Sequence, residues 1–331
     1  MPFLTSAHHG LKKRVQDLVD KMIAPHAEEI EGTHEFPQRS HKAFGREKLF
    51  TLSMPKAYGG PEADALSLAL MVETISTVSP SSALLVFPTN AVLRTIALTG
   101  TAEQKDRFFT ELRPGDQPMG FCLTEPDYGS DAGSLQTRAE RQGDDYIVSG
   151  TKSFITLGPH ARYYMTFVRT GPGPKAAGIS ALLIPRDAGG LEFGPPEKKM
   201  GLHGSITSQM YLDKVRVPVA NRLWGEGEGW RVLTEVANPM RVWGAASMSL
   251  GTAQGLFNLA LEHARTTKSG GRHLISQQSV SFLLAEMQMR IEASRSLNYR
   301  ACALLDRGGA HPREVETLVS MAKCYASDTA M

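Results

Sequence analysis

The hydrophobic period of this chain changes twice along its length, and this constrains the fold more than any other feature. Near the start, apolar residues recur every three or four positions, as at Leu11, Val15 and Leu18, which is typical of the buried face of a helix. From about Phe121 the pattern becomes strand-like, and after Gly229 the helical period returns. This order indicates an α+β fold with separate domains, because a doubly wound sheet needs strands and helices that alternate.

Domain limits follow from these changes of period. We predict a helical domain over residues 1–118, a β-sheet domain over 119–222 and a C-terminal helical bundle over 223–331. Within the first domain, Ser81–Leu98 is apolar on most sides, so we expect a central core helix there. The last helix of the bundle is expected to start near Pro312, since proline suits the first turn of a helix.

Several shorter elements can also be bounded. Thr101 is suited to the N-cap of the helix that follows it. Strands are expected over Tyr163–Arg169 and Ile179–Pro185, and the glycine- and proline-rich stretch Gly171–Pro174 between them predicts a loop. A tight turn over Gln142–Asp145, between two strand-like runs, predicts a β-hairpin.

The composition excludes several classes of partner. The net charge of +2 gives no reason to expect nucleic acid or a membrane surface. The cysteines Cys122, Cys302 and Cys324 are far apart and lack CxxC spacing, which argues against a disulfide framework and against a metal site. The most apolar run, Ala83–Phe87, is far shorter than the ~20 residues that span a bilayer. We therefore expect a cytoplasmic protein.

Two short blocks carry the most specific information. The block Phe121–Asp131 reads FCLTEPDYGSD, and Gly150–Thr156 reads GTKSFIT. Together they resemble the flavin-binding segments of the acyl-CoA dehydrogenase family, and the resemblance runs in order from about Leu11 to Met331. Weaker matches stand at Tyr58–Gly60, Gly100–Lys105, Met200–Ser205 and Val215–Pro218.

The resemblance implies an FAD cofactor. A flavin ring has apolar faces and one polar edge, so its site needs an apolar wall and a few fixed donors. Phe154 would supply the wall, where many family members carry Trp, and Thr124, Ser130 and Thr156 would supply hydroxyl groups. The residues that the resemblance assigns to the cofactor are Phe121, Leu123, Thr124, Gly129, Ser130, Phe154, Ile155, Thr156 and Gln278.

The same resemblance implies a site for acyl-CoA. Its residues would be Ser130, Asn238 and Arg241. Arg241 keeps the arginine that the family places near the CoA moiety, and Asn238 stands where the family has Asp. A guanidinium group can pair with phosphate or stack on adenine.

One segment departs from the family pattern. The family commonly has an Arg and a Phe that reach the FAD of a neighbouring subunit, and these positions are Thr267 and Gly270 here. Lys268 or Arg272 could supply the missing positive charge, which a pyrophosphate group needs.

The implied reaction is FAD-dependent α,β-dehydrogenation of an acyl-CoA thioester. A carboxylate takes the α proton, and flavin N5 takes a hydride from the β carbon. The glutamate that serves as this base in most members would lie beyond Met331, and the alternative position in other members is Met240. No catalytic residue is therefore assigned, and Glu73, Glu125 and Glu235 are not assigned as the base.

Three interpretations remain open at this point. The chain is expected to lack the last part of its helical bundle, and would then be an ordinary dehydrogenase that passes electrons to an electron-transfer flavoprotein. In the second interpretation, a partner chain supplies the base. In the third, the chain is a divergent flavoprotein that does not need this base, either a flavin oxidase or oxygenase or a non-catalytic acyl-CoA- and FAD-binding subunit. The resemblance also implies a homotetramer or a dimer. The length and branching of the acyl group cannot be read from the sequence.

Overall fold

The computed structural model describes residues 4–173, 175–309 and 311–331. The chain divides into two compact units. The bundle unit comprises Met1–Ala27, Asp64–Ala83 and Pro239–Met331, and the sheet unit comprises Glu28–Ala63 and Leu84–Asn238. Each unit is described by itself below.

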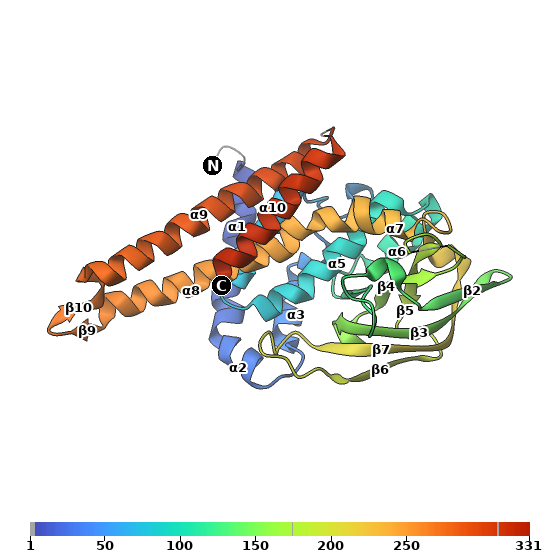
Figure 1. Ribbon diagram of the computed structural model, residues 1–331, viewed down its shortest axis with the longest axis horizontal. Coiled ribbons are helices and arrows are strands. Elements are labelled where there is room, and N and C mark those ends of the chain that lie inside the picture. Colours follow the sequence, from blue (N-terminus) through green and yellow to red (C-terminus); the bar gives the residue numbers. More distant parts are fainter. Residues whose placement is uncertain (1–3, 174, 310) are drawn as a thin grey trace. The chain divides into compact units, whose positions relative to one another are not determined.

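Helices form most of the chain outside the middle segment (Figure 1). They are α1 (Ser6–Leu18), α2 (Ala27–Gly32), α3 (Gln38–Arg46), α4 (Ala65–Ser76), α5 (Pro80–Thr99), α6 (Ala102–Leu112), α7 (Gly229–Arg231), α8 (Ser247–Thr266), α9 (Gln278–Arg307) and α10 (Pro312–Ala330). The start of α10 at Pro312 confirms the predicted position of this helix.

The strands of the sheet unit form one twisted, mostly antiparallel sheet. In chain order they are β1 (Met119–Cys122), β2 (Arg138–Gln142), β3 (Asp145–Thr156), β4 (Tyr163–Arg169), β5 (Ile179–Pro185), β6 (Leu191–Pro196), β7 (Thr207–Pro218) and β8 (Arg222–Leu223). Their order in the sheet is β6-β7-β3-β2-β4-β5-β8, and β1 pairs in parallel with β4.

The predicted strand boundaries are confirmed where the strands are buried on both faces. Six of the seven residues of β4 are buried, and the same holds for β5, so both appear in the sequence as nearly continuous apolar runs. The hairpin between β2 and β3 turns at Gly143, which has a φ of +63°, with Gln142 paired to Asp145. Of the predicted loop, Gly171–Gly173 is described, and Pro174 lies outside the described residues.

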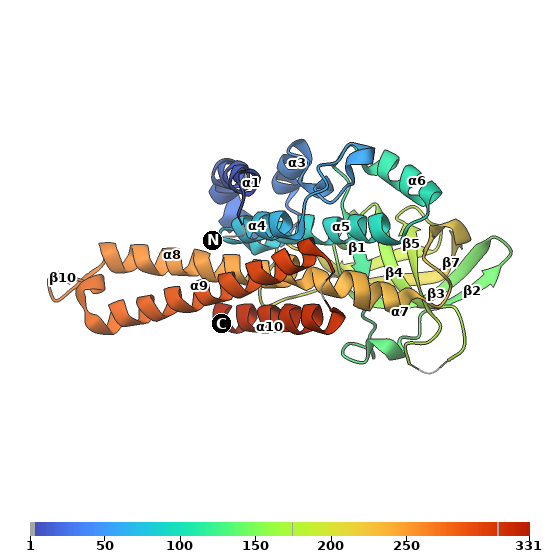
Figure 2. The same cartoon turned by 90° about the horizontal axis from the view of Figure 1, so that it is seen from above.

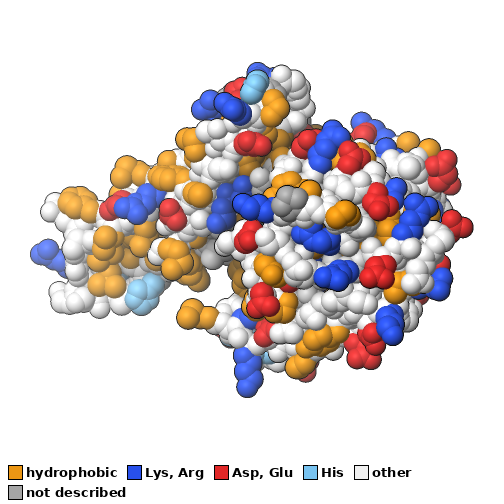
Figure 3. All heavy atoms as spheres, turned by 45° about the vertical axis from the view of Figure 1, so that its right-hand side comes forward, with side chains coloured by type: hydrophobic (Ala, Val, Ile, Leu, Met, Phe, Trp, Pro, Cys, Tyr) orange, Lys and Arg blue, Asp and Glu red, His pale blue; other side chains and the backbone are white. Residues whose placement is uncertain are grey.

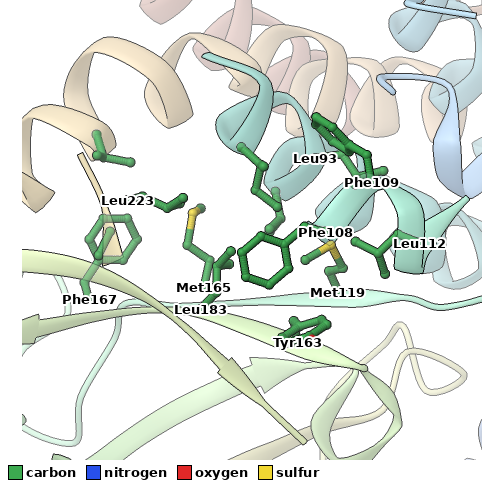
Figure 4. Close-up of a cluster of buried hydrophobic side chains, with 14 of the residues drawn as sticks. Leu93, Phe108, Phe109, Leu112, Met119, Tyr163, Met165, Phe167, Leu183 and Leu223 are labelled. Atoms are coloured by element: carbon green, nitrogen blue, oxygen red, sulfur yellow. The ribbon is translucent and has the colours of Figure 1, made fainter. Parts of the chain in front are cut away.

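An apolar cluster joins the helices of the sheet unit to the sheet. Figure 4 shows Leu93 of α5 and Phe108 of α6 facing Met165 of β4 and Leu183 of β5, and all four side chains are fully or almost fully buried. At the start of α6, Thr101 accepts a hydrogen bond from the Gln104 N–H, which confirms its predicted capping role. The cluster therefore forms the core on which the sheet rests.

Helix α5 is the predicted central core helix. By length and composition alone it could cross a membrane, but 72% of its apolar window is buried inside the protein. A helix that is apolar all round and covered by its own chain is typical of a protein core.

The bundle unit consists mainly of long antiparallel helices. Helices α8 and α9 lie side by side in both cartoon views, joined by a small hairpin of β9 (Lys268–Ser269) and β10 (Arg272–His273) (Figures 1 and 2). Between α4 and α9, the buried Glu73 carboxylate accepts hydrogen bonds from Arg295 Nε at 3.0 Å and from Tyr299 Oη at 2.8 Å. This ion pair ties an N-terminal segment of the chain to a C-terminal one.

The long helices also carry large apolar side chains at their surface. Hydrophobic side chains are visible at the surface in the space-filling view (Figure 3). The exposed ones on α8 and α9 are Leu256, Leu259, Phe282, Leu283, Met287 and Met289.

Candidate functional site

The two motif blocks lie side by side in the sheet unit. The backbone N–H of Ser153 in β3 donates to the carbonyl oxygen of Thr124, which follows β1, at 2.8 Å. At the other end of the same edge, a Cβ built on Gly120 would lie 3.7 Å from the backbone oxygen of Thr156. Residues 121–124 and 153–156, which belong to the two motif blocks, therefore lie side by side along one edge.

Phe154 projects from this edge on an irregular piece of strand. The pairing of β3 with β7 shifts register between Lys152 and Ile155, and Phe154 between them has a left-handed φ of +57°. A bulge of this kind re-aims a side chain. As a result, Phe154 is 65% exposed, whereas the next side chain, Ile155, is 1% exposed and belongs to the core. A left-handed phenylalanine is strained, and such strain is most often found at functional sites.

Three hydroxyl groups along the motifs are free. Within the described part of the chain, the side chains of Thr124, Ser130 and Thr156 make no hydrogen bond to the protein. Thr124 and Thr156 are half-buried, and Ser130 is exposed in the loop after β1, next to the exposed Gly129. These groups are thus available to a ligand, and half-buried donors bind best to a partner that replaces water.

The other residues of the first block form the support of the edge. Phe121 packs against Phe167 of β4, with ring centroids 5.3 Å apart, and Leu123 packs against the apolar cluster. An exposed aromatic face beside free hydroxyl groups has the apolar wall and polar edge that a flavin ring requires. The residues of the sheet unit therefore fit FAD.

A buried ion pair lies directly behind this edge. Lys152 Nζ lies 2.8 Å from Glu125 Oε1, and the two residues are 0% and 5% exposed. The Glu125 carboxylate also accepts the backbone N–H groups of Gln136 at 2.6 Å and Thr137 at 2.9 Å. Burial alone would raise the pKa of Glu125, but Lys152 and these donors together hold that pKa below its usual range. Glu125 is therefore held as a carboxylate.

Between the sheet and α8, the chain runs through irregular helix. Val232–Ala237 and Val242–Ala246 are π-helical, and a 3₁₀ turn, Asn238–Arg241, lies between them. Such π-helical turns are frequent at functional sites. This stretch carries Asn238, at the end of the sheet unit, and Arg241, in the bundle unit.

Two residues of this stretch have informative environments. The Arg241 Nε atom is buried and has no hydrogen-bond partner within the described chain, and a buried donor of this kind is costly unless a ligand satisfies it. Met240 is 3% exposed and has no acidic group. It is a core residue of the bundle unit and cannot accept a proton.

The departure from the family pattern lies in the β9–β10 hairpin of the bundle unit. Gly270 and Gly271 have φ values of +60° and +80° and form its tip, a conformation that glycine adopts without strain. Lys268 and Arg272 are exposed on the two strands. Gln278 is the first residue of α9 and is also exposed. The hairpin thus replaces the expected arginine and phenylalanine by a tight turn with positive charge on either side.

None of the three unassigned glutamates offers a free carboxylate. Glu73 is bound by Arg295, and Glu125 by Lys152. Glu235 lies on an exposed helical turn, where Arg231 donates to it at 3.0 Å. A general base needs a carboxylate within reach of the proton it removes, and the omission of all three from the catalytic assignment stays a prediction.

Sequence reasoning missed one part of the site. Lys152 and Glu125 were read as letters of the motifs and given no role. The available signal was that each motif block has a charged residue close to one expected to face a ligand, since Glu125 directly follows Thr124 and Lys152 stands two positions before Phe154. Charge at such a position predicts either a solvated side chain or a buried pair, and the structure has the buried pair.

Comparison with known proteins extends the resemblance to the whole chain. Family models of the N-terminal, middle and C-terminal domains of acyl-CoA dehydrogenase match residues 5–116, 120–215 and 227–331, respectively. The chain is 38% identical over 322 residues to an acyl-CoA dehydrogenase of Bacillus subtilis strain 168, which covers 97% of this chain and 84% of that protein.

Solved structures agree with the sequence relatives. The butyryl-CoA dehydrogenase of Megasphaera elsdenii is 30% identical, with a TM-score of 0.93 over 98% of this chain and 85% of that one. A glutaryl-CoA dehydrogenase of Mycobacterium smegmatis, solved in complex with FADH2, is 25% identical, with a TM-score of 0.89 over 99% of this chain and 82% of that one.

The arrangement of a helical segment, a β-sheet segment and a second helical segment, the two motif blocks on one edge and the three matching family models lead to one assignment. The chain belongs to the acyl-CoA dehydrogenase family of FAD-dependent oxidoreductases.

Proposed function

We propose that the edge formed by Thr124, Phe154 and Thr156 holds the flavin ring of FAD, and that the chain uses this cofactor to dehydrogenate an acyl-CoA thioester between its α and β carbons. The observation that carries the proposal is the exposed Phe154 beside two half-buried hydroxyl groups that have no partner in the described protein. Bound FAD would supply the acceptor for the two electrons that leave the substrate.

Each residue of the sheet unit would have a distinct part. The Phe154 ring would cover an apolar face of the flavin, and the Thr124 and Thr156 hydroxyl groups would bind its polar edge. Gly129 and Ser130, exposed in the loop after β1, would bind the pyrophosphate and the acyl-CoA. Phe121 and Leu123 would support the edge from the core, and Ile155 would contribute through its backbone because its side chain is buried.

In the bundle unit, Arg241 and Gln278 would bind the polar ends of the two ligands. The buried, unpartnered Nε of Arg241 supports a role toward a CoA phosphate, together with Asn238 at the end of the sheet unit. The exposed Gln278 would contact the adenosine half of FAD. Lys268 or Arg272 would supply the positive charge that Thr267 and Gly270 lack.

Several broader features belong to the same proposal. The domain limits of 1–118, 119–222 and 223–331 are supported by the ranges that the three family models match. The exposed apolar side chains on α8 and α9 support assembly into a homotetramer or a dimer. An electron-transfer flavoprotein is proposed as the electron acceptor, and the cytoplasm as the site of action.

Two measurements test the central proposal on the purified protein. The protein should carry a yellow flavin spectrum after purification or after incubation with FAD. Anaerobic addition of acyl-CoAs of increasing chain length should then bleach the flavin, and the acyl group that bleaches it fastest would identify the substrate. Bound flavin that no acyl-CoA bleaches would contradict the dehydrogenase, and would favour an oxygen-using relative or an acyl-CoA- and FAD-binding subunit.

A variant pair tests the flavin edge itself. Phe154→Ala should weaken FAD binding at least tenfold, because it removes the proposed aromatic wall, and should not prevent folding, because the Phe154 side chain is exposed. Tyr211→Ala is the matched control, since Tyr211 is an exposed aromatic residue, 42% accessible, on the neighbouring strand β7. Equal FAD affinity in the two variants would contradict the placement of the flavin against Phe154.

A further inference from the structure

The buried pair of Lys152 and Glu125 is the strongest feature of the sheet unit to which the proposed function gives no role. Both residues belong to the motif blocks, yet neither faces solvent at the exposed edge. Lys152 stands two positions before Phe154 on β3, and Glu125 directly follows Thr124. The pair therefore joins the strand that carries the aromatic wall to the segment that carries the first hydroxyl group.

The contacts of Lys152 hold the two residues that flank Thr124, one by its backbone and one by its side chain. Its ammonium group donates to the carbonyl oxygen of Leu123 at 3.1 Å and to the Glu125 carboxylate at 2.8 Å. Between these two contacts, the carbonyl oxygen of Thr124 itself accepts the N–H of Ser153. Three successive residues are thus tied to β3, so the position of the Thr124 hydroxyl depends on Lys152.

Glu125 extends the connection to a third segment. Its two carboxylate oxygens accept the N–H groups of Gln136 and Thr137, just before β2. Its own backbone closes a tight turn with Tyr128, in which each residue donates its N–H to the carbonyl oxygen of the other, at 3.1 and 3.2 Å. This turn leads directly to Gly129 and Ser130, so the start of the loop is also fixed by Glu125.

Stability alone is a weak reason for such a pair. Removing two charges from water is costly, and well-packed apolar residues often stabilise a core equally well. What a fully bonded charged pair supplies is a unique geometry, because each bond requires one arrangement of donor and acceptor. The geometry here is the spacing between the segment at Thr124 and the bulge at Phe154.

We propose that Lys152 and Glu125 are positioning residues for the flavin, which hold the Thr124 hydroxyl and the Phe154 ring in register without touching the cofactor. This inference rests on the proposed function, since it assumes that the edge binds the flavin ring. Loss of either charge leaves the segment at Thr124 held to β3 by fewer bonds, with the backbone bond from Ser153 to Thr124 retained, and lets the donor shift relative to the aromatic wall.

The test compares this pair with a second buried pair of the same kind. Lys152→Met and Glu125→Gln remove one charge each, and Glu73→Gln removes the corresponding charge from the Glu73–Arg295 pair of the bundle unit. Each purified protein is stripped of flavin and titrated with FAD, well below its melting temperature. The visible circular dichroism of the bound flavin is recorded as a measure of the environment of the ring.

The expected result separates positioning from general stability. All three variants should melt at lower temperature than the wild type. Only Lys152→Met and Glu125→Gln should raise the FAD dissociation constant, by tenfold or more, and change the flavin dichroism. Glu73→Gln should bind FAD within about twofold of the wild type, because its effect on the fold is spread over a different unit.

Clear outcomes would overturn the inference. If Glu125→Gln binds FAD as tightly as the wild type with unchanged dichroism, the pair does not position the flavin. If Glu73→Gln loses as much FAD affinity as the other two variants, the loss is a general effect of lower stability and the inference is also wrong. If Lys152→Met does not fold, Glu125→Gln decides the question, because it keeps the shape of the side chain. A wild-type protein that binds no FAD would instead contradict the proposed function. The inference itself concerns only how the FAD affinity of each variant differs from that of a wild-type protein that binds flavin.

Discussion

Two glycines on α8 allow this helix to pack against α4, and substituting them gives a sharp test of the bundle unit. A Cβ built on Gly251 would lie 2.2 Å from the carbonyl oxygen of Glu73, and one built on Gly255 would lie 2.1 Å from that of Thr77. Real Cβ atoms essentially never approach closer than 3.0 Å, and the nearest atom in the way at each glycine belongs to the backbone. Gly251→Ala must therefore move one helix away by about 0.8 Å, in a core that is closely packed.

Two opposing terms set the size of the effect. Alanine favours the helical state over glycine by about 1 kcal/mol. Overpacking costs about 1–3 kcal/mol and more where backbone must shift, and almost every residue of α4 is buried, so this helix has no free side to which it can move. We expect Gly251→Ala to lower the free energy of unfolding by about 2 kcal/mol, with the packing term larger than the helix term.

Gly10→Ala on α1 is the matched control. Nothing lies within 4 Å of a Cβ at Gly10, so only the helix term acts and stability should rise by up to about 1 kcal/mol. Urea denaturation followed by circular dichroism measures both variants. The double variant Gly251→Ala/Gly255→Ala should cost less than the sum of the single variants, because the helices need to separate only once. A Gly251→Ala protein at least as stable as the wild type would refute the close contact between α8 and α4.

Three further predictions concern the sheet unit. Gln104→Ala removes the reciprocal cap of α6 and two bonds to backbone oxygens, so urea denaturation should show a loss of about 1–3 kcal/mol. Asn90→Ala leaves the buried N–H of Ser53 without its acceptor at 2.9 Å and should cost about 2 kcal/mol in the same assay; a loss near zero would show that the acceptor is replaced. The pKa of Glu125 in the folded state lies below its ordinary value of 4.5, so the unfolded state binds the proton more readily. The stability that the Glu125–Lys152 pair contributes is therefore fully present above about pH 4.5 and is lost as the pH falls through the folded-state pKa. Glu125→Gln should therefore flatten the fall of the melting temperature in acid, and an unchanged slope would refute this role.

The sequence predicts this fold best where one physical signal acts alone. Strands β4 and β5 were bounded correctly to the residue, because burial on both faces makes them continuous apolar runs. The start of α10 at Pro312 and the cap of α6 at Thr101 were also correct, since both follow from local hydrogen-bond geometry. These elements owe little to residues that are distant in sequence.

Elements that depend on distant partners were missed. Strand β6, Leu191–Pro196, contains two prolines and one buried residue, so it has no apolar alternation and exists because it pairs with β7. The π-helical stretches at Val232–Ala237 and Val242–Ala246 have an ordinary helical composition. Their wider turns therefore cannot be predicted from the sequence. Such features arise from packing around the element.

At the proposed flavin edge, the sequence predicted which residues matter but not which of them face outward. Thr124, Phe154 and Thr156 were selected because their chemistry matches a flavin, and they remain at least partly exposed. The bulge that turns Phe154 outward is invisible in the sequence, since an alternating strand would have placed Phe154 on the same face as the buried Lys152. The exposure of Phe154 beside the buried Lys152 follows from that single shift of register. The residues of the second block thus divide into an exposed one, Phe154, which we propose faces the ligand, and buried ones, and this division cannot be seen without the register of β3.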